Sequence, residues 1–165
     1  MFYDYLKTDI IGTLTLVADE KGLRHINFQT ARHPVHLEQD WKHKPSFFTE
    51  TKAQFKAYFN GEINAFNLPL APIGTDFQKR VWQTLQKIPY GTVTSYLWVA
   101  EQIGNPKAVR AVGGANGKNP LPVVIPCHRV IGSDGSLTGF GAGLDIKKRL
   151  IELEKTFTTL EEPTR

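Results

Sequence analysis

The one cysteine of the chain, Cys127, stands between Pro126 and His128 in the segment "VVIPCHRVIG". A thiol is a good nucleophile only as the thiolate, and a free cysteine is mostly protonated at neutral pH. A neighbouring imidazole can take the thiol proton, directly or through water, and a carboxylate can orient that imidazole. Glu152 and Glu154 lie on the last predicted helix, so these residue types are compatible with a Cys–His–Glu relay.

The residues alone leave a second interpretation open. In an extended strand, Cys127 and His128 would point to opposite faces, unless the break at Pro126 re-aims them. A lone cysteine in an apolar segment can also be a buried structural residue, and a backbone carbonyl can satisfy a half-buried imidazole. The five histidines form no HExxH pattern. We therefore expect neither a bound metal nor a cofactor.

The composition, with 41% hydrophobic and 22% charged residues in 165, is typical of a globular protein of one large or two small domains. No apolar run approaches the roughly 18 residues that a membrane span needs. Asp4 and Asp9 stand where a secretory signal would carry positive charge. We therefore expect a cytoplasmic protein, and its single cysteine excludes an internal disulfide.

The net charge of +4 lies entirely in the second half of the chain. Residues 1–75 carry eight basic and eight acidic side chains, whereas residues 76–129 carry seven basic and two acidic ones. Such asymmetry is compatible with a polyanionic partner, and also with an ordinary solvated basic surface.

The first half has the pattern of a small α+β unit. Residues 13–18 and 23–28 read as two alternating strands joined by a turn, and residues 50–61 as a helix with Phe55 and Phe59 on one stripe. The segment "NLPLAPIG" then interrupts regular structure. We expect two domains, residues 1–72 and residues 73–165.

The second half begins with a strong helix signal, because Thr75 and Gln78 can form a capping box. Apolar residues follow at helical spacing: Phe77, Val81, Leu85 and Ile88. The segments "TSYLWVAEQIG" and "NPKAVRAVGGAN" predict two more helices, the second with Asn105 as its N-cap and Pro106 in its first position. A tight turn between two short helices is typical of a helix-turn-helix, although other αα-hairpins share it.

The second helix of this pair carries Lys107 and Arg110 beside several small residues: Ala108, Ala111, Gly113, Gly114 and Ala115. Each glycine within a helix costs about 1 kcal/mol relative to alanine. Close core packing and a DNA groove both explain such a slim helix. Beyond it, "VVIPCHRVIG" predicts a buried strand broken at Pro126, and residues 144–154 predict a helix with Ile146, Leu150 and Leu153 inward.

The string "IPCHRV" resembles the active-site signature of the O6-alkylguanine-DNA alkyltransferases, or methylated-DNA–protein-cysteine methyltransferases. The resemblance extends through "GTDFQKRVWQTLQKIPYGTVTSY" and "IGNPKAVRAVGGANGKNPLPVVIPCHRVIGSDGSLTGFGAG", and the first half resembles the family in layout. It implies a two-domain α/β protein. An RNase H-like N-terminal domain, with an antiparallel sheet and a helix, would precede a mainly helical C-terminal domain with a winged helix-turn-helix.

The resemblance also implies the reaction. The protein would flip an O6-alkylguanine out of double-stranded DNA and transfer the alkyl group irreversibly to Cys127, acting once as a monomer. O4-alkylthymine and longer alkyl groups also fit the family. His128 would be the general base through a bound water, Glu154 rather than Glu152 would hold His128, Tyr96 would donate a proton to guanine N3, and Asn119 would anchor the active-site loop.

Two further sets of residues follow from the same resemblance. Those implied to contact DNA are Arg110, as an arginine finger, with Lys107, Ala108, Ala111, Gly113, Gly114, Asn116, Thr94 and Ser95. Those implied to line the base pocket are Tyr96, Cys127, Val130, Phe140 and Gly141, with the carbonyls of Cys127 and Val130 accepting from the guanine amino group. Many relatives have serine at the position of Gly141.

Three classes of protein compete for this sequence. A DNA alkyltransferase accounts for the cysteine, the helix pair and the uneven charge together. A cysteine hydrolase accounts only for the cysteine. A non-catalytic alkyltransferase-like DNA binder accounts for everything except Cys127, which such relatives typically replace. The presence of Cys127 favours the first class.

Overall fold

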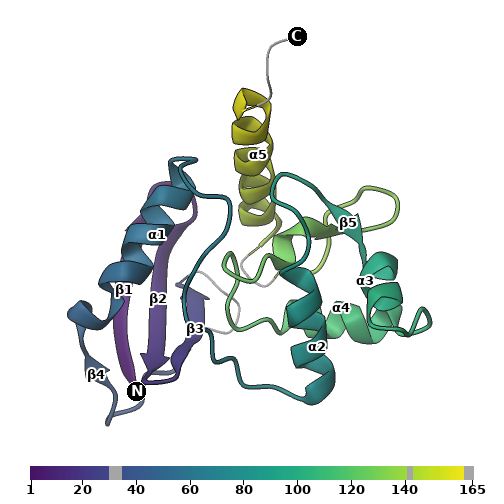
Figure 1. Ribbon diagram of the computed structural model, residues 1–165. Helices are drawn as coiled ribbons and strands as arrows, with labels where there is room; N and C mark the ends of the chain where they lie inside the picture. Colours follow the sequence, from purple (N-terminus) through teal and green to yellow (C-terminus); the bar gives the residue numbers. More distant parts are fainter. Residues whose placement is uncertain (30–34, 141–142, 162–165) are drawn as a thin grey trace. The chain divides into compact units, whose positions relative to one another are not determined.

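The computed structural model describes residues 1–29, 35–140 and 143–161 (Figure 1). The chain forms two compact units, of which the first combines Met1–Ile73 with Pro120–Val124. The second combines Gly74–Asn119 with Ile125–Arg165. No single cut separates the units, because the chain leaves the second after Asn119 and returns to it at Ile125.

The first unit contains a four-stranded sheet in the order β3-β2-β1-β4. Strands β1 (Phe2–Thr8), β2 (Gly12–Asp19) and β3 (Gly22–Phe28) are antiparallel, and β4 (Lys42–His43) pairs in parallel with β1. Strands β2 and β3 confirm the two predicted strands, whereas β1 was not predicted. The buried residue of β1 is the charged Asp4, so this strand has no apolar alternation for the sequence to show.

Helix α1 (Thr49–Phe59) confirms the predicted helix, and a 3₁₀ turn, η1 (Pro45–Phe48), precedes it. Its buried face comprises Thr51, Phe55 and Tyr58. The predicted stripe is confirmed, because the ring centres of Phe55 and Phe59 lie 6.0 Å apart, although Phe59 is only half-buried while Tyr58 is fully buried.

Two segments distant in sequence cover the outer edge of β3. The amide of Leu23 donates to the carbonyl of Pro69 (2.9 Å), and the amide of Ile26 donates to the carbonyl of Pro120 (2.8 Å). A β-carbon at Gly22 would lie 2.5 Å from the Pro69 carbonyl oxygen, so this close approach requires glycine. Residues 120–124 therefore belong to the first unit, and Pro120 supplies a hydrogen bond to the edge of its sheet.

The second unit is mainly helical, with α2 (Asp76–Leu85), α3 (Tyr96–Gln102), α4 (Val109–Gly117) and α5 (Leu144–Glu161) (Figure 1). The capping box is confirmed: the Gln78 amide donates to Thr75 Oγ1 (3.1 Å), and the Thr75 amide donates to Gln78 Oε1 (3.0 Å). The indole of Trp82 donates to the Ala115 carbonyl (2.9 Å), which joins α2 to α4.

Helices α3 and α4 form the predicted pair, but the start of the second helix was predicted wrongly. The amide of Ala108 donates to the Asn105 carbonyl (3.0 Å), which closes a turn over residues 105–108. The first helical bond runs from the Val112 amide to the Ala108 carbonyl (2.8 Å), so Ala108 rather than Asn105 is the N-cap. Lys107 and Ala108 therefore precede the helix.

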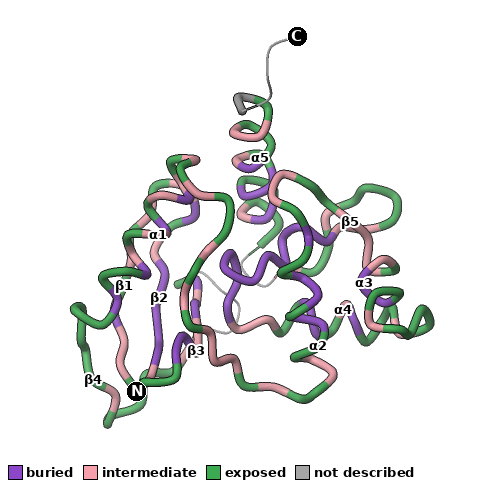
Figure 2. The backbone as a smooth tube through the Cα atoms, in the orientation of Figure 1, coloured by how far each residue is buried: buried purple, intermediate pink, exposed green. Residues whose placement is uncertain are grey.

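The segment around the cysteine is not the predicted strand. Residues Cys127–Arg129 form a 3₁₀ turn, η2, and only β6 (Val130–Ile131) is extended, paired in parallel with β5 (Thr94–Ser95). Residues 121–130 are all buried, so their β-branched side chains reflect burial and not strand geometry (Figure 2).

The inward face of α5 also differs from the prediction. It comprises Lys147, Leu150, Ile151 and Glu154, whereas Ile146 and Leu153 are half-buried. Two ionisable side chains thus occupy helix positions where apolar residues are the rule. None of the helices within the described residues is long and apolar enough to span a membrane.

Candidate active site

The 3₁₀ turn η2 determines how the side chains of Cys127 and His128 are presented. The Cys127 amide donates to the Ile125 carbonyl (2.8 Å), and the Arg129 amide donates to the Pro126 carbonyl (3.0 Å). Successive side chains on such a turn do not diverge to opposite faces as they would on a strand. Both side chains are buried, with Cys127 4% and His128 0% exposed.

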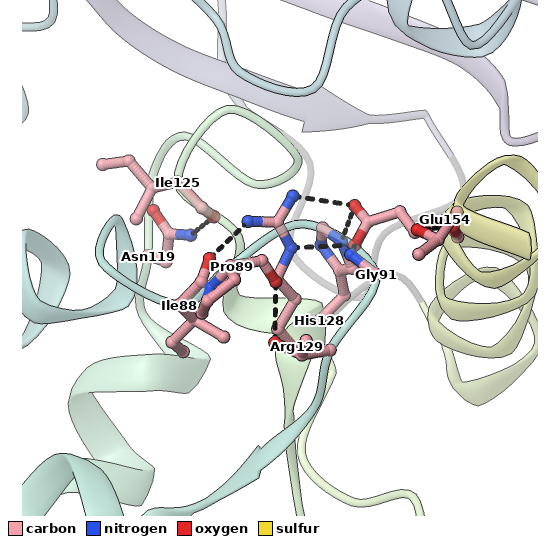
Figure 3. A network of polar contacts seen from close by, with 10 residues as sticks. Ile88, Pro89, Gly91, Asn119, Ile125, His128, Arg129 and Glu154 are labelled. Carbon is pink, nitrogen blue, oxygen red and sulfur yellow. Dashed lines mark hydrogen bonds and ion pairs between the residues drawn. The ribbon is translucent and has the colours of Figure 1, made fainter. Parts of the chain in front are cut away.

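Glu154 of α5 accepts a hydrogen bond from the His128 ring. The distance between His128 Nε2 and Glu154 Oε2 is 2.7 Å, and both side chains are buried (Figure 3). Glu152 points elsewhere, because its side chain is 63% exposed. The residue types alone left open whether Glu152 or Glu154 would orient the histidine. The structure places Glu154 beside it.

Arg129 is a member of this site that the sequence analysis missed. Its Nε donates to Glu154 Oε1 (2.8 Å), its Nη2 to Glu154 Oε2 (3.0 Å) and its Nη1 to the Ile88 carbonyl (2.8 Å) (Figure 3). The guanidinium carbon also lies 5.6 Å from the centre of the Tyr90 ring. Such a bidentate pair fixes the carboxylate in one orientation. The sequence did contain a signal for Arg129, because this residue directly follows Cys127 and His128.

Burial and hydrogen bonding determine the charges of the three relay groups. Burial alone would raise the pKa of Glu154, but hydrogen bonds from His128 and Arg129 outweigh it and lower that pKa to about 2. Burial lowers the pKa of His128 and raises the pKa of the Cys127 thiol to about 11. The resting site therefore holds a thiol, a neutral imidazole and a carboxylate.

The neutral imidazole has one nitrogen left for proton transfer. Because Nε2 donates to a carboxylate that stays ionised, the acceptor nitrogen of the ring is Nδ1. Among the described residues, His128 Nδ1 is a buried polar atom without a hydrogen-bond partner. The arrangement can therefore take a proton at Nδ1 while Glu154 stabilises the resulting imidazolium.

Two asparagines support the cysteine from outside the turn. Asn119 donates to the Ile125 carbonyl (2.8 Å), joining the two ends of the excursion over residues 120–124, and its side chain also hydrogen-bonds Cys127. Asn116 was predicted among the DNA contacts, but it is buried, and its Nδ2 lies 3.5 Å from the Cys127 carbonyl oxygen. This position fits a support of Cys127 and not a surface contact.

Tyr96 is the first residue of α3 and faces two glycines. Its hydroxyl lies 3.1 Å from Thr138 Oγ1, and a β-carbon at Gly139 would lie 3.3 Å from the same hydroxyl. A β-carbon at Gly113 would lie 4.0 Å from the Tyr96 ring. Of the other predicted pocket residues, Val130 is buried in β6, Phe140 is half-buried, and Gly141 lies outside the described residues.

Lys147 of α5 is the second site residue that the sequence analysis missed. Its side chain is fully buried, and its Nζ donates to the carbonyls of Val130 and Thr138, both at 2.6 Å. A signal existed, since Lys147 stands three and seven residues before Leu150 and Glu154 on one helical stripe.

The exposed face of α4 carries three of the nine residues predicted to contact DNA. Arg110, Ala111 and Gly114 are exposed, and Gly113 is half-buried. A β-carbon at Gly114 would meet no described atom within 4 Å, so packing inside the protein does not account for this glycine. Lys107 is exposed in the turn before α4, and Thr94 and Ser95 form β5, where Ser95 Oγ caps α3 by accepting from the Trp98 amide.

Family models match nearly the whole chain. The ribonuclease-like domain of 6-O-methylguanine DNA methyltransferase matches residues 1–72, and the DNA binding domain of 6-O-methylguanine DNA methyltransferase matches residues 76–156. The chain belongs to the 6-O-methylguanine DNA methyltransferase family. The two-domain α/β fold expected for this family is thereby confirmed.

Individual members of the 6-O-methylguanine DNA methyltransferase family resemble the chain over most of its length. A methylated-DNA–protein-cysteine methyltransferase of Methanosarcina barkeri is 49% identical over 155 residues, which cover 94% of this chain and 98% of that protein. The enzyme of the same name from Haemophilus influenzae is 42% identical over 156 residues, 94% of this chain and 87% of that protein. The crystal structure of Mycobacterium tuberculosis OGT in complex with DNA superposes with a TM-score of 0.88 at 43% identity, covering 95% of this chain and 94% of that one.

Proposed function

We propose that this family member repairs DNA by transferring the alkyl group of O6-alkylguanine to its own Cys127. One observation carries the assignment: the single cysteine shares a 3₁₀ turn with a histidine whose ring bonds a buried carboxylate at 2.7 Å. The relatives named methylated-DNA–protein-cysteine methyltransferases support the same reaction.

The transfer is a displacement at the alkyl carbon. His128 takes the thiol proton of Cys127 at Nδ1, through a bound water, and Glu154 stabilises the imidazolium. The sulfur then forms a bond to the alkyl carbon as the bond from that carbon to guanine O6 breaks. Tyr96 supplies a proton to guanine N3, so that the base leaves as neutral guanine, and the product at Cys127 is a thioether.

The target base must leave the double helix before it can react, because a buried thiol cannot reach O6 inside a duplex. In our proposal α4 lies against the DNA, and Arg110 on its exposed face fills the space that the base vacates. The carbonyls of Cys127 and Val130 accept from the guanine amino group. DNA binding and transfer thus belong to residues 73–165, and the protein acts as a cytoplasmic monomer.

The proposal is tested with a duplex oligonucleotide containing one O6-methylguanine. After incubation, mass spectrometry of the digested protein should find a single added methyl group on the peptide with Cys127. An unmodified peptide, with the lesion still in the DNA, would identify a non-catalytic lesion binder instead. A methyl group on any other residue would remove Cys127 from the reaction.

A further inference from the structure

Lys147 is a lysine whose whole side chain is buried in the second unit. Lysine is almost never fully buried without a partner, because removing its charge from water costs free energy. Its two hydrogen bonds, both 2.6 Å, go to the neutral carbonyls of Val130 and Thr138. Within the described part of the chain, no carboxylate forms an ion pair with Lys147.

The charges buried around Cys127 do not balance in the resting state. Glu154 carries one negative charge and Arg129 one positive charge, and these two are paired. His128 is neutral, so Lys147 leaves one positive charge uncompensated. Burial lowers the pKa of Lys147 and raises the pKa of Cys127, whereas the interaction between the two groups opposes both shifts and favours the ammonium and the thiolate. A thiolate at Cys127 would therefore bring the buried charge to zero.

The two carbonyls that Lys147 binds belong to different parts of the base pocket. Val130 lies in β6, directly after the turn that carries the cysteine, and its carbonyl is a proposed acceptor for the base. Thr138 lies in the segment that contacts the Tyr96 hydroxyl. One ammonium group thus holds together the strand behind the cysteine and the segment beside the proton donor.

We propose that Lys147 is a positioning residue for alkyl transfer: its buried ammonium group fixes the Val130 and Thr138 carbonyls and balances the negative charge of the Cys127 thiolate. This inference rests on the proposed role of Cys127 as the acceptor. Once the thioether has formed, the sulfur is neutral, so Lys147 stabilises the reactive thiolate and not the product.

The test is the pH dependence of iodoacetamide alkylation, which reports Cys127 alone because the chain has one cysteine. Lys147→Met removes the charge and both donors, Lys147→Gln keeps a donor without charge, and Lys147→Arg keeps the charge. We expect the apparent pKa of Cys127 to rise by about one unit in the Met and Gln variants, with about tenfold slower alkylation at neutral pH. The Arg variant and the control Lys148→Met, at an exposed neighbour, should follow the wild type.

Far-UV circular dichroism selects the variants that fold, and Lys147→Gln serves if Lys147→Met does not. Single-turnover methyl transfer from DNA at neutral pH should slow by the same factor as alkylation. A folded Met or Gln variant with the wild-type pH profile overturns the inference, and so does an Arg variant that shifts as far as the uncharged ones. Failure of the wild type to accept a methyl group from DNA would refute the proposed function instead, since the alkylation assay contains no DNA.

Discussion

A thiol with a pKa of about 11 carries almost no negative charge at neutral pH, so Cys127 needs its proton removed during the reaction itself. In the proposed mechanism, the Glu154 carboxylate prepares His128 for this step in two ways. It fixes the ring through the 2.7 Å bond, and it stabilises the imidazolium that forms when Nδ1 takes the proton.

Replacing the carboxylate should therefore affect chemistry and not binding. Glu154→Gln should slow single-turnover methyl transfer by roughly 10²-fold, the lower end of what general acid–base catalysis contributes. Its affinity for lesion-containing duplex should stay within about threefold of wild type. Glu152→Gln, an exposed change on the same helix, is the matched control for both measurements. Equal transfer rates in the Glu154 variant and the wild type would remove Glu154 from the mechanism.

A substitution at Asn116 should likewise change the rate of alkyl transfer without changing the affinity for DNA. It is buried and reaches the Cys127 carbonyl, so Asn116→Ala should slow transfer at saturating protein while leaving the affinity for undamaged duplex unchanged. Arg110→Ala, an exposed change on the same helix, is the comparison and should lower the rate on duplex DNA through base extrusion. A gel-shift titration and a single-turnover assay measure the two quantities. Weaker binding by Asn116→Ala would return this residue to the DNA-contacting surface.

Among the elements, α4 is unusual because two glycines, Gly114 and Gly117, are exposed on it. Glycine costs about 1 kcal/mol in a helix relative to alanine, and at Gly114 no described atom would be near an added β-carbon. Stability alone would thus favour a larger residue there. The glycine is explained if another molecule approaches the helix backbone.

Gly114→Leu should consequently stabilise the free protein and weaken its binding to duplex DNA. We expect the thermal midpoint to rise by roughly 2–4 °C. The dissociation constant for duplex DNA should increase several-fold, because the new side chain occupies the contact surface. Ala53→Leu, at an exposed position of α1, controls for the added apolar surface. Unchanged DNA affinity in Gly114→Leu would mean that this face of α4 does not meet the DNA.

The elements also show what sequence patterns can and cannot predict. Strand β2, helix α1 and the capping box of α2 were predictable, because their signals are local: alternation, helical spacing and a four-residue cap. The turn η2 was not predictable as a turn, because uniform burial over residues 121–130 erases periodicity. The start of α4 was misplaced because the Asn105 carbonyl serves a turn instead of a helix.

The candidate site likewise contains some residues that were predicted from the sequence and others that were missed. Cys127, His128 and Glu154 could be named because their chemistry is recognisable from residue type and from the family resemblance. Arg129 and Lys147 were missed despite their sequence positions, since a basic residue is expected at the surface, and their burial is seen in the folded chain. The partners that tune the reactive groups thus depend on tertiary structure.

For the whole molecule, a single cysteine limits the number of reactions. A thioether is a very poor leaving group, and the chain has no second thiol to accept the alkyl group. Each molecule should react once, so the burst of repaired DNA should equal the concentration of active protein. Quantifying repaired oligonucleotide at several protein concentrations measures this ratio. Continued turnover without added reductant would contradict irreversible transfer.

The buried Glu154 also makes the stability of the molecule sensitive to acid. Its pKa is about 2 in the folded protein, below the ordinary value of 4.5, so its contribution to stability is complete above about pH 4.5 and is lost as the pH falls towards 2. Between pH 7 and pH 3 this group alone should cost about 2 kcal/mol of unfolding free energy. Urea unfolding of wild type and Glu154→Gln at both values measures it. A Glu154→Gln variant that loses as much stability as the wild type would contradict this assignment.

The excursion of residues 120–124 into the first unit has a consequence for how the protein is made. Strands β1, β2 and β3 leave the ribosome early, yet the Pro120 carbonyl that pairs with Ile26 is added more than ninety residues later. Until then one edge of the nascent sheet keeps an unpaired amide. The hydrogen bond at Ile26 can therefore form only when synthesis has come within seven residues of Cys127. During translation, the first unit is therefore completed only shortly before the segment with Cys127 is synthesised.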